Sequence, residues 1–221
     1  MNILNLNDKI QHVCFDLDGT IINSYQTIYK ATLRALEELK INTPFLEEKF
    51  HNMIGLHFVD IFEELNIPVT DFEEFIEIYK THYFDYIDDS IIYEGVNETL
   101  KEINDFKIKV SLLTTKGQGQ ADKIIDHFKL RKYFDLVMGR RNGIAHKPSP
   151  EPLLLICSEL KISPENSLMV GDTELDIECG KNAKVKTCAA NYGYRKEEQL
   201  RLYKPDFIIN NISELIPILK Y

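Results

Sequence analysis

Two aspartates one residue apart follow a short apolar run near the start of the chain. In the stretch HVCFDLDGTIINS, Asp16 and Asp18 come directly after the run and are followed by a glycine, and no basic residue stands within ten positions after Asp18. Carboxylates at the end of a buried strand can bind a divalent cation, attack an electrophile or transfer protons. The positive charge that would balance them has to come from a distant segment or from a bound ion.

Three later segments carry the other side chains that could share this chemistry. They are Thr114-Thr115-Lys116, His146-Lys147-Pro148 and Gly171-Asp172-Thr173, the last followed by Asp176 four residues after Asp172. Each segment comes at or soon after the end of a short apolar run. In open parallel sheets, ligands bind beyond the carboxyl ends of the strands. We therefore expect three or four carboxylates, hydroxyl groups and a lysine to gather at one edge of a sheet.

Short apolar runs alternate with amphipathic segments over most of the chain. The runs predict strands over 13–17, 108–115, 133–139, 167–172, 185–190 and 206–210, and the amphipathic segments predict helices over 94–106, 118–128, 150–160, 175–183 and 196–203. Continuous apolar strands separated by helices are typical of a parallel sheet that is covered on both faces. The pattern predicts an α/β fold with a doubly wound, Rossmann-like core.

A different pattern fills the segment from Ser24 to about Ser90. Every periodic stretch in it predicts a helix, with Ser24 as the N-cap of the first and Thr70 or Asp71 as the start of the last. This segment holds 14 acidic and 5 basic residues, a net charge of −9, whereas the rest of the chain holds 21 of each. We predict a catalytic core of residues 1–22 and 91–221, interrupted by an all-helical cap of residues 23–90.

Electrostatics favours a metal at the predicted edge if the substrate is a phosphate. A carboxylate about 4 Å from a phosphate dianion, at an effective dielectric constant of about 20, meets roughly 8 kcal/mol of repulsion. Attack by Asp16 on phosphorus therefore requires a lysine and a cation to offset the charge. Mg²⁺ prefers hard oxygen ligands and few protein carboxylates, so we expect it between Asp16 and Asp172.

Four motifs in the chain resemble those of a known family. DLDGT, LLTT, KPSPEP and GDTELD, in that order, resemble the motifs of the haloacid dehalogenase superfamily of phosphatases. Within it, the chain is similar to the phosphoglycolate phosphatase-like group, whose helical cap lies between the first two motifs. The resemblance spans nearly the whole chain and implies a Rossmann-like core under a mobile cap.

The resemblance also implies roles for particular residues. Asp16 would be the nucleophile and Asp18 the general acid and base, while Asp16, Asp172 and the backbone carbonyl of Asp18 would bind Mg²⁺. The phosphoryl group would be bound by Thr114 and Lys147, with Thr115 as a further candidate. Asp176 would lie behind the metal ligands, near Lys147.

Two departures from the family pattern bear on the substrate. Related phosphatases usually have Asn where this chain has Thr115, so any contact of that amide with substrate is in doubt. Phosphosugar mutases tend to carry a basic residue in the cap turn that here reads MIGLHFVDIF, with His57 and Phe58. His57 is a candidate substrate contact, while His146 and the pair Arg140-Arg141 are interpreted as surface or structural residues.

The sequence therefore predicts a Mg²⁺-dependent phosphatase that hydrolyses a small, phosphoglycolate-like phosphomonoester through an aspartyl-phosphate. Alternatives on the same fold are a phosphomutase resembling beta-phosphoglucomutase and an inorganic pyrophosphatase. A signalling receiver domain also uses a phosphorylated Asp, a Thr and a Lys. Receivers, however, are about half this length and lack a helical insertion.

Composition limits the partners and the compartment. The chain has no basic stripe for nucleic acid and no apolar run near the roughly 20 residues that span a bilayer, and Met1–Asp8 is too polar for a signal peptide. Four scattered cysteines without a CxxC pair are expected to be reduced core residues. We expect a cytoplasmic monomer or homodimer that acts on a small phosphorylated metabolite, with no nucleic-acid or membrane partner.

Overall fold

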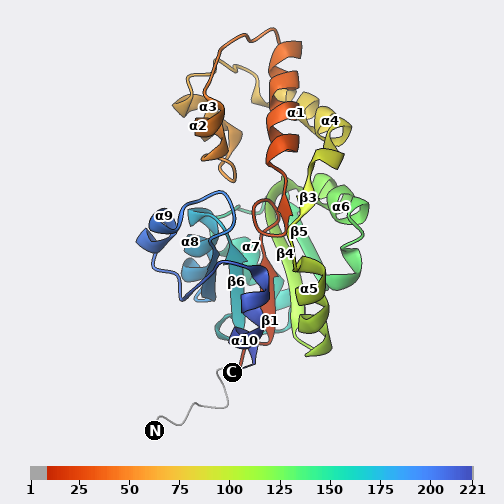
Figure 1. The fold of residues 1–221 in the computed structure, drawn as a ribbon, viewed down its shortest axis with the longest axis vertical. Helices are drawn as coiled ribbons and strands as arrows, with labels where there is room; N and C mark the ends of the chain where they lie inside the picture. The colour runs from red at the N-terminus through yellow and green to blue at the C-terminus, as the bar shows by residue number, and fades with distance from the viewer. Residues whose placement is uncertain (1–8, 221) are drawn as a thin grey trace.

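The strand that leads to Asp16 lies in the middle of the central sheet (Figure 1). The computed structural model describes residues 9–220; the segment 1–8, where we expected no signal peptide, lies outside the described residues. The sheet has six strands in the order β5-β4-β1-β6-β7-β8, and every neighbouring pair is parallel. Their bounds are β1 His12–Phe15, β4 Lys109–Gly117, β5 Leu136–Arg140, β6 Ser167–Gly171, β7 Lys186–Ala190 and β8 Phe207–Ile209.

Helices cover both faces of this sheet. One face packs against α7 (Glu151–Leu160) and α8 (Glu174–Asn182), and the other against α5 (Val96–Asp105), α6 (Gln118–His127) and the short α10 (Leu215–Leu219). Successive side chains of a strand point to opposite faces of the sheet. Val13 and Phe15 of β1 therefore pack in one apolar cluster and Cys14 packs in the other. With α9 (Glu197–Leu202) on the connection from β7 to β8, the predicted doubly wound α/β core is confirmed.

The strand order reverses beside β1, and this reversal decides where the site forms. The chain runs from β1 to β4 and β5 on one side, then returns to build β6, β7 and β8 on the other. Phe15 at the end of β1 is in register with Val170 of β6 and with Leu112 of β4. The residues that follow these strands therefore meet at the switch point, where ligands bind in open α/β sheets.

The four helices α1 to α4 are inserted between the short strands β2 (Ile22–Asn23) and β3 (Ile91–Ile92) and lie above the carboxyl edge of the sheet (Figure 1). Their bounds are α1 Tyr25–Glu38, α2 Glu47–His51, α3 Phe58–Glu64 and α4 Phe72–Asp85. The two segments that connect the core to the cap form a short antiparallel strand pair, β2 and β3. The predicted cap boundaries, at residues 23 and 90, fall beside this strand pair. Asp71, one of the two predicted starts of the last cap helix, accepts a hydrogen bond from the Glu74 backbone.

Ser24 stands at the predicted N-cap position of α1, but its side chain makes no cap hydrogen bond. Its hydroxyl donates instead to the Asp18 carboxylate and lies 3.2 Å from the Tyr194 hydroxyl. Ser24 is therefore the N-cap residue of α1, as predicted, but its hydroxyl does not cap the helix. A charged acceptor beside the sheet competes for the same donor, and hydrogen bonds to charged groups are the stronger ones.

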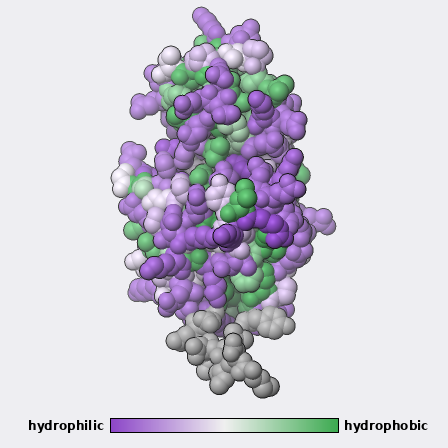
Figure 2. All heavy atoms as spheres, turned by 90° about the vertical axis from the view of Figure 1, so that its left-hand side faces the viewer, coloured by the Kyte–Doolittle hydropathy of each residue, from purple (hydrophilic) through white to green (hydrophobic). Residues whose placement is uncertain are grey.

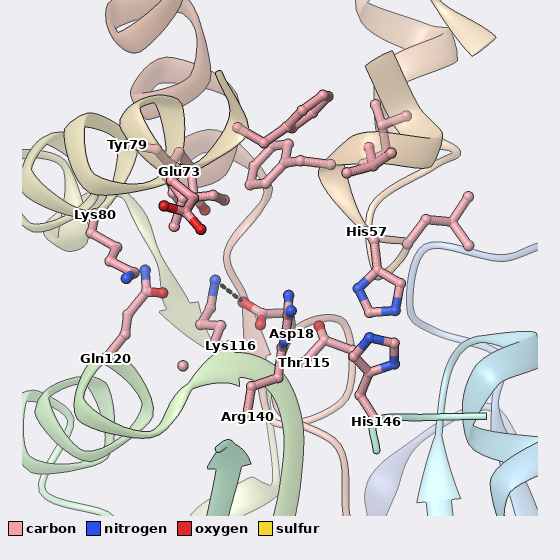
Figure 3. Close-up of a pocket in the computed structure, with 18 of the residues that line it drawn as sticks. Asp18, His57, Glu73, Tyr79, Lys80, Thr115, Lys116, Gln120, Arg140 and His146 are labelled. Atoms are coloured by element: carbon pink, nitrogen blue, oxygen red, sulfur yellow. Dashed lines mark ion pairs between the residues drawn. The ribbon is translucent and has the colours of Figure 1, made fainter. Parts of the chain in front are cut away.

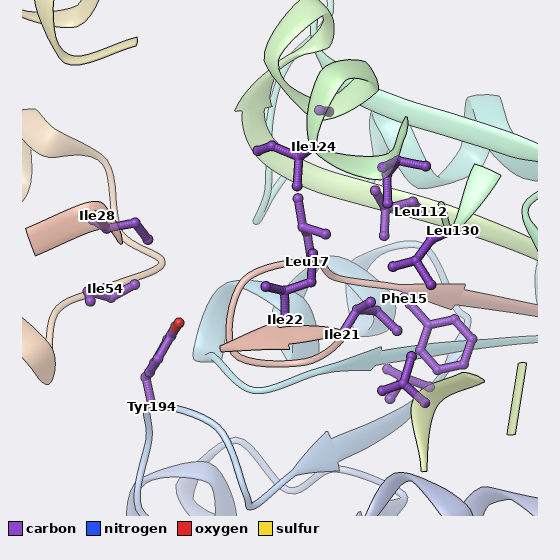
Figure 4. Close-up of a cluster of buried hydrophobic side chains, with 14 of the residues drawn as sticks. Phe15, Leu17, Ile21, Ile22, Ile28, Ile54, Leu112, Ile124, Leu130 and Tyr194 are labelled. Carbon is purple, nitrogen blue, oxygen red and sulfur yellow. The ribbon is translucent and has the colours of Figure 1, made fainter. Parts of the chain in front are cut away.

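The apolar interior runs without a break from the core into the cap. Figure 4 shows Leu17 between Ile22 of β2 and Ile124 of α6, with Ile28 and Ile54 of the cap farther to the left. The surface in Figure 2 is mostly hydrophilic over both parts. All four cysteines are buried and free, as predicted. Within residues 9–220, no helix is both long enough and apolar enough to cross a membrane.

Candidate active site

Lys147 holds together the carboxylates at the switch point. Its Nζ lies 2.6 Å from Asp16 Oδ1 and 2.6 Å from Asp176 Oδ1, and the lysine side chain is buried. Burial by itself would lower the pKa of Lys147, but the charges of Asp16 and Asp176 outweigh it and hold the pKa above its ordinary value. The ammonium group therefore stays charged beside the predicted nucleophile, although it is 131 residues away in sequence.

The buried carboxylates outnumber the lysine that balances them. Oxygen atoms of Asp16, Asp172 and Asp176 all lie within 4.8 Å of one another. Burial raises the pKa of Asp16 well above its usual range, the Lys147 charge opposes this, and the neighbouring aspartates add to it. Burial and then the Asp176 charge raise the pKa of Asp172 to about 7. A cluster of this kind is stabilised by further positive charge.

The oxygens of this cluster differ in what they already bind. Asp176 accepts from Lys147 with one oxygen and from the backbone N–H and hydroxyl of Thr173 with the other, at 3.0 and 2.7 Å, which closes a capping box at the start of α8. Among the described residues, Asp16 accepts a hydrogen bond through Oδ1 only, and each oxygen of Asp172 accepts a single uncharged donor, so these two carboxylates keep lone pairs that can bind an ion. Hard oxygen donors from two carboxylates fit Mg²⁺, with water and a substrate oxygen completing the shell.

Asp172 is held firmly from three sides. Its Oδ1 accepts a hydrogen bond from the Thr20 hydroxyl at 3.0 Å, and its Oδ2 accepts one from the Tyr194 backbone at 2.8 Å. Gly19 packs against the same carboxylate with φ +85°, and a Cβ built there would lie 2.3 Å from Asp172 Oδ2. Only glycine fits this position, because it combines a left-handed backbone with a close approach.

Asp18 lines a cavity between the cap and the core, where its carboxylate points toward Lys116 (Figure 3). It accepts a hydrogen bond from Ser24, and its Oδ1 lies 3.3 Å from Lys116 Nζ, which itself lies 4.2 Å from the centroid of the Tyr83 ring. The carboxylate faces the cavity described below, where it can exchange a proton with a bound molecule. The expectation that the Asp18 backbone carbonyl binds Mg²⁺ stays a prediction.

The two threonines at the end of β4 lie next to β1 in the sheet. Thr114 is buried, and its Oγ1 accepts a hydrogen bond from the Lys116 backbone at 3.2 Å. Thr115 is half-buried and lines the cavity. Their predicted contacts with a phosphoryl group stay predictions.

A cavity of about 840 Å³ lies between the cap and the core, and Asp18 forms part of its wall. His57 lines it from the cap side, with its ring centroid 4.1 Å from that of His146. Burial and the nearby His146 and Arg140 lower the pKa of His57. His146, Arg140 and Arg141 are exposed, and they also line this cavity, which is the alternative to a purely surface or structural role.

Several contributors were missed by reasoning from the sequence. Ser24 binds Asp18, Thr20 and Tyr194 hold Asp172, and buried Arg195 donates to Glu174 and to the Ile54 carbonyl of the cap. Tyr194 and Arg195 follow β7, whose carboxyl end lies at the same edge of the sheet. Applying the strand-end rule to that strand would have identified both.

Comparison with known proteins agrees with this geometry. The family model described as haloacid dehalogenase-like hydrolase matches residues 13–190. A protein of Bacillus cereus named pyrophosphatase PpaX is 36% identical over 212 residues, which cover 96% of this chain and 97% of that protein. Proteins named pyrophosphatase PpaX from Bacillus thuringiensis match to the same extent.

Solved structures match over nearly the whole chain. A haloacid dehalogenase-like family hydrolase of Streptococcus pneumoniae has a TM-score of 0.84 at 21% identity and covers 95% of this chain and 98% of its own. A structure from Haemophilus somnus, named a predicted phosphoglycolate phosphatase, has a TM-score of 0.81 at 23% identity and covers 95% and 97%. At these identities the two structures establish the fold.

The family match decides between the hydrolases and the receiver domains considered above. It extends from Val13 on β1 through the end of β7 and so includes the cap and all four motifs. A receiver domain is therefore excluded. The chain belongs to the haloacid dehalogenase-like hydrolases.

Proposed function

We propose that this hydrolase is a Mg²⁺-dependent phosphatase that uses Asp16 as its nucleophile. The observation that carries the proposal is the position of Lys147, whose Nζ lies 2.6 Å from the Asp16 carboxylate inside a buried cluster with Asp172. Burying two aspartates with one lysine leaves unbalanced charge, which costs folding free energy. A functional role for the cluster accounts for this cost better than a structural one. Together they supply an anionic nucleophile and the positive charge it needs to approach a phosphate.

In the first half of the reaction, an Asp16 oxygen attacks phosphorus. The bond from phosphorus to the leaving oxygen breaks with its electron pair, and Asp18 donates a proton to that oxygen. In the second half, a water oxygen attacks the phosphorus of the aspartyl-phosphate while Asp18 takes the proton from the water. The bond to Asp16 then breaks and inorganic phosphate leaves.

The surrounding residues have separate tasks in this scheme. Lys147 and the Thr114 hydroxyl would bind the oxygens of the transferred phosphoryl group, and Ser24 and Lys116 hold Asp18 toward the cavity. Mg²⁺, held by Asp16 and Asp172, would supply further positive charge to the phosphoryl oxygens. Asp176 keeps Lys147 in place.

We propose inorganic pyrophosphate as the first substrate to test and a phosphoglycolate-like monoester as the second. Both carry a second anionic group beside the phosphoryl group that is transferred. Support comes from the cavity wall, which has four basic side chains: Lys80, Lys116, Arg140 and Arg141. Relatives that are 36% identical over most of their length are named pyrophosphatases, and this favours pyrophosphate of the two.

Replacing Asp16 by Asn tests the assigned nucleophile. We expect phosphate release from pyrophosphate in the presence of Mg²⁺ to fall by more than about 10³-fold, because the amide cannot form the covalent intermediate. The measurement is colorimetric detection of phosphate, with circular dichroism to establish that the variant folds. Asp105→Asn makes the same chemical change at an exposed residue of α5 and should leave the rate unchanged. A folded Asp16→Asn variant with the original rate would contradict the assignment.

A further inference from the structure

The basic residues of the cavity are not equally balanced by acidic ones. Lys80 Nζ lies 2.6 Å from Glu77, and Lys116 Nζ lies 3.3 Å from Asp18. Arg140 faces the same cavity, and no carboxylate of residues 9–220 lies within ion-pair distance of it. Arg141 also has no carboxylate within ion-pair distance among residues 9–220, but its guanidinium donates to the Gln118 side chain. The positive charge that remains free to bind an anion is therefore on the side of Arg140 and Arg141.

Two histidines share that side with Arg140 (Figure 3). His57 comes from the cap, at the start of α3, and His146 comes from the core, directly before Lys147. Their rings are tilted by 38°, with centroids 4.1 Å apart. His57 Nε2 is buried, and nothing in the part of the chain that the structure describes hydrogen-bonds to it. A buried nitrogen without a partner costs free energy unless a ligand satisfies it.

The charges acting on His57 indicate that this corner of the cavity is electropositive. After burial, the largest influences that lower the pKa of His57 are His146 and Arg140. Asp60, on the same helix α3, and the Lys147 backbone raise the pKa of His57, but by less than His146 and Arg140 lower it. An anion bound between these groups would relieve their mutual repulsion. The ring of His57 lies 4.1 Å from that of His146, the residue directly before Lys147, which binds Asp16.

We propose that Arg140, His57 and His146 bind the second anionic group of the substrate, which in pyrophosphate is the leaving phosphate. This inference rests on the proposed function. A guanidinium binds phosphate through two parallel N–H donors, and each imidazole adds a further donor. Because His57 belongs to the cap and the other two residues belong to the core, the bound anion contacts both the cap and the core. Substrates with a second anionic group are thus selected over simple monoesters.

Kinetics with two substrates test this assignment on the full chain with Mg²⁺. We expect Arg140→Gln to raise KM for pyrophosphate about 10- to 100-fold, the loss usual for a charge-assisted contact. His57→Gln and His146→Gln should raise it about 3- to 10-fold, because each removes a single donor. With p-nitrophenyl phosphate, which has no second phosphate, the three variants should stay within about twofold of the original.

Arg201→Gln is the matched control, since Arg201 is exposed, pairs with Glu197 on α9 and lies outside the cavity. It should behave as the unmodified protein with both substrates. Equal losses on both substrates in Arg140→Gln, or no change on either, would overturn the inference. If the unmodified protein releases phosphate from p-nitrophenyl phosphate but not from pyrophosphate, the substrate proposal fails instead.

Calorimetric binding of imidodiphosphate, the non-hydrolysable analogue of pyrophosphate, tests the cluster independently of turnover. The unmodified protein should bind it more tightly than inorganic phosphate, and Arg140→Gln should weaken imidodiphosphate binding about 10-fold or more while leaving phosphate binding unchanged. Imidodiphosphate binding that is no tighter than phosphate binding, or insensitive to Arg140, overturns the inference whatever the rates.

Discussion

At the scale of single residues, the site depends on how Asp16 and Asp176 share one lysine. Both carboxylates lie 2.6 Å from Lys147, but only Asp176 is also bound by Thr173 at the start of α8. Asp176 thus accepts three hydrogen bonds, whereas Asp16 accepts one, from Lys147, and keeps a second oxygen that accepts none from the described residues. The two residues have the same chemistry, and their other contacts give them different tasks.

Asp176→Asn should separate these tasks. The amide oxygen can still accept the hydrogen bonds of Thr173, while its NH₂ group would face the Lys147 ammonium in place of an acceptor. We expect kcat to fall about 10- to 100-fold, because small displacements of a positioned group are costly in catalysis. KM should change little. An unaltered kcat in a folded variant would show that Asp16 alone positions the lysine.

At the scale of secondary-structure elements, the cap depends on the contact between its two long helices. α1 and α4 pack along each other, and His82 near the end of α4 joins them. Its Nε2 lies 2.8 Å from Glu38, the last residue of α1, and its Nδ1 lies 3.0 Å from Asp85. The hydrogen bond to Glu38 is the main cause that raises the pKa of His82, with burial acting against it and Asp85 adding to the rise.

The raised pKa gives this contact a defined pH dependence. A histidine whose pKa is higher in the folded than in the unfolded chain stabilises fully below the unfolded value of about 6.5, and loses that effect as the pH rises through the folded value. We expect His82→Gln to lower Tm at pH 5.5 and to leave it unchanged at pH 9. Measuring both proteins by differential scanning calorimetry across this range is the test. A Tm difference that grows with pH would contradict it.

At the scale of the whole molecule, charge is divided between the cap and the core. The segment 24–90 carries the entire net charge of −9, yet only Glu73 and Glu77 of its acidic residues line the cavity. Lys116, Arg140 and Arg141 reach the cavity from the core. The acidic cap therefore keeps most of its charge away from the cavity, whose wall holds four basic side chains and three carboxylates, Asp18, Glu73 and Glu77.

Closing this cavity on a ligand should stabilise the whole chain. At a concentration about 100 times Kd, a ligand that binds only the folded state adds about 2.7 kcal/mol, which raises Tm by about 5–10 °C at this chain length. We expect Mg²⁺ and imidodiphosphate together to produce this shift. EDTA should abolish the shift and the phosphate release, and Mg²⁺ should restore both. Asp172→Asn should fold and show no shift, and full activity in EDTA would contradict the metal site.

Much of the fold could be predicted because local patterns encode it. The apolar runs that end at Phe15, Gly171 and Ala190 became strands within a few residues of the predicted bounds, and the helical period over 25–38 became α1. The sequence did not predict the short pair β2 and β3, because two residues carry no periodic signal. It correctly placed Ser24 at the N-cap of α1, but nothing local shows that the Ser24 hydroxyl bonds to Asp18 instead of to the helix.

The order of apolar runs and polar residues along the chain already places Asp16, Thr114, Lys147 and Asp172 at or soon after successive strand ends, and parallel strands bring such residues to one edge. Only the tertiary structure decided which of them touch, and which side chains oppose them across the cavity. His57 and His146 are 89 positions apart, and their contact depends on how the cap packs on the core. Periodicity is a property of neighbouring residues, whereas the pairing of distant ones is fixed by the packing of the whole chain.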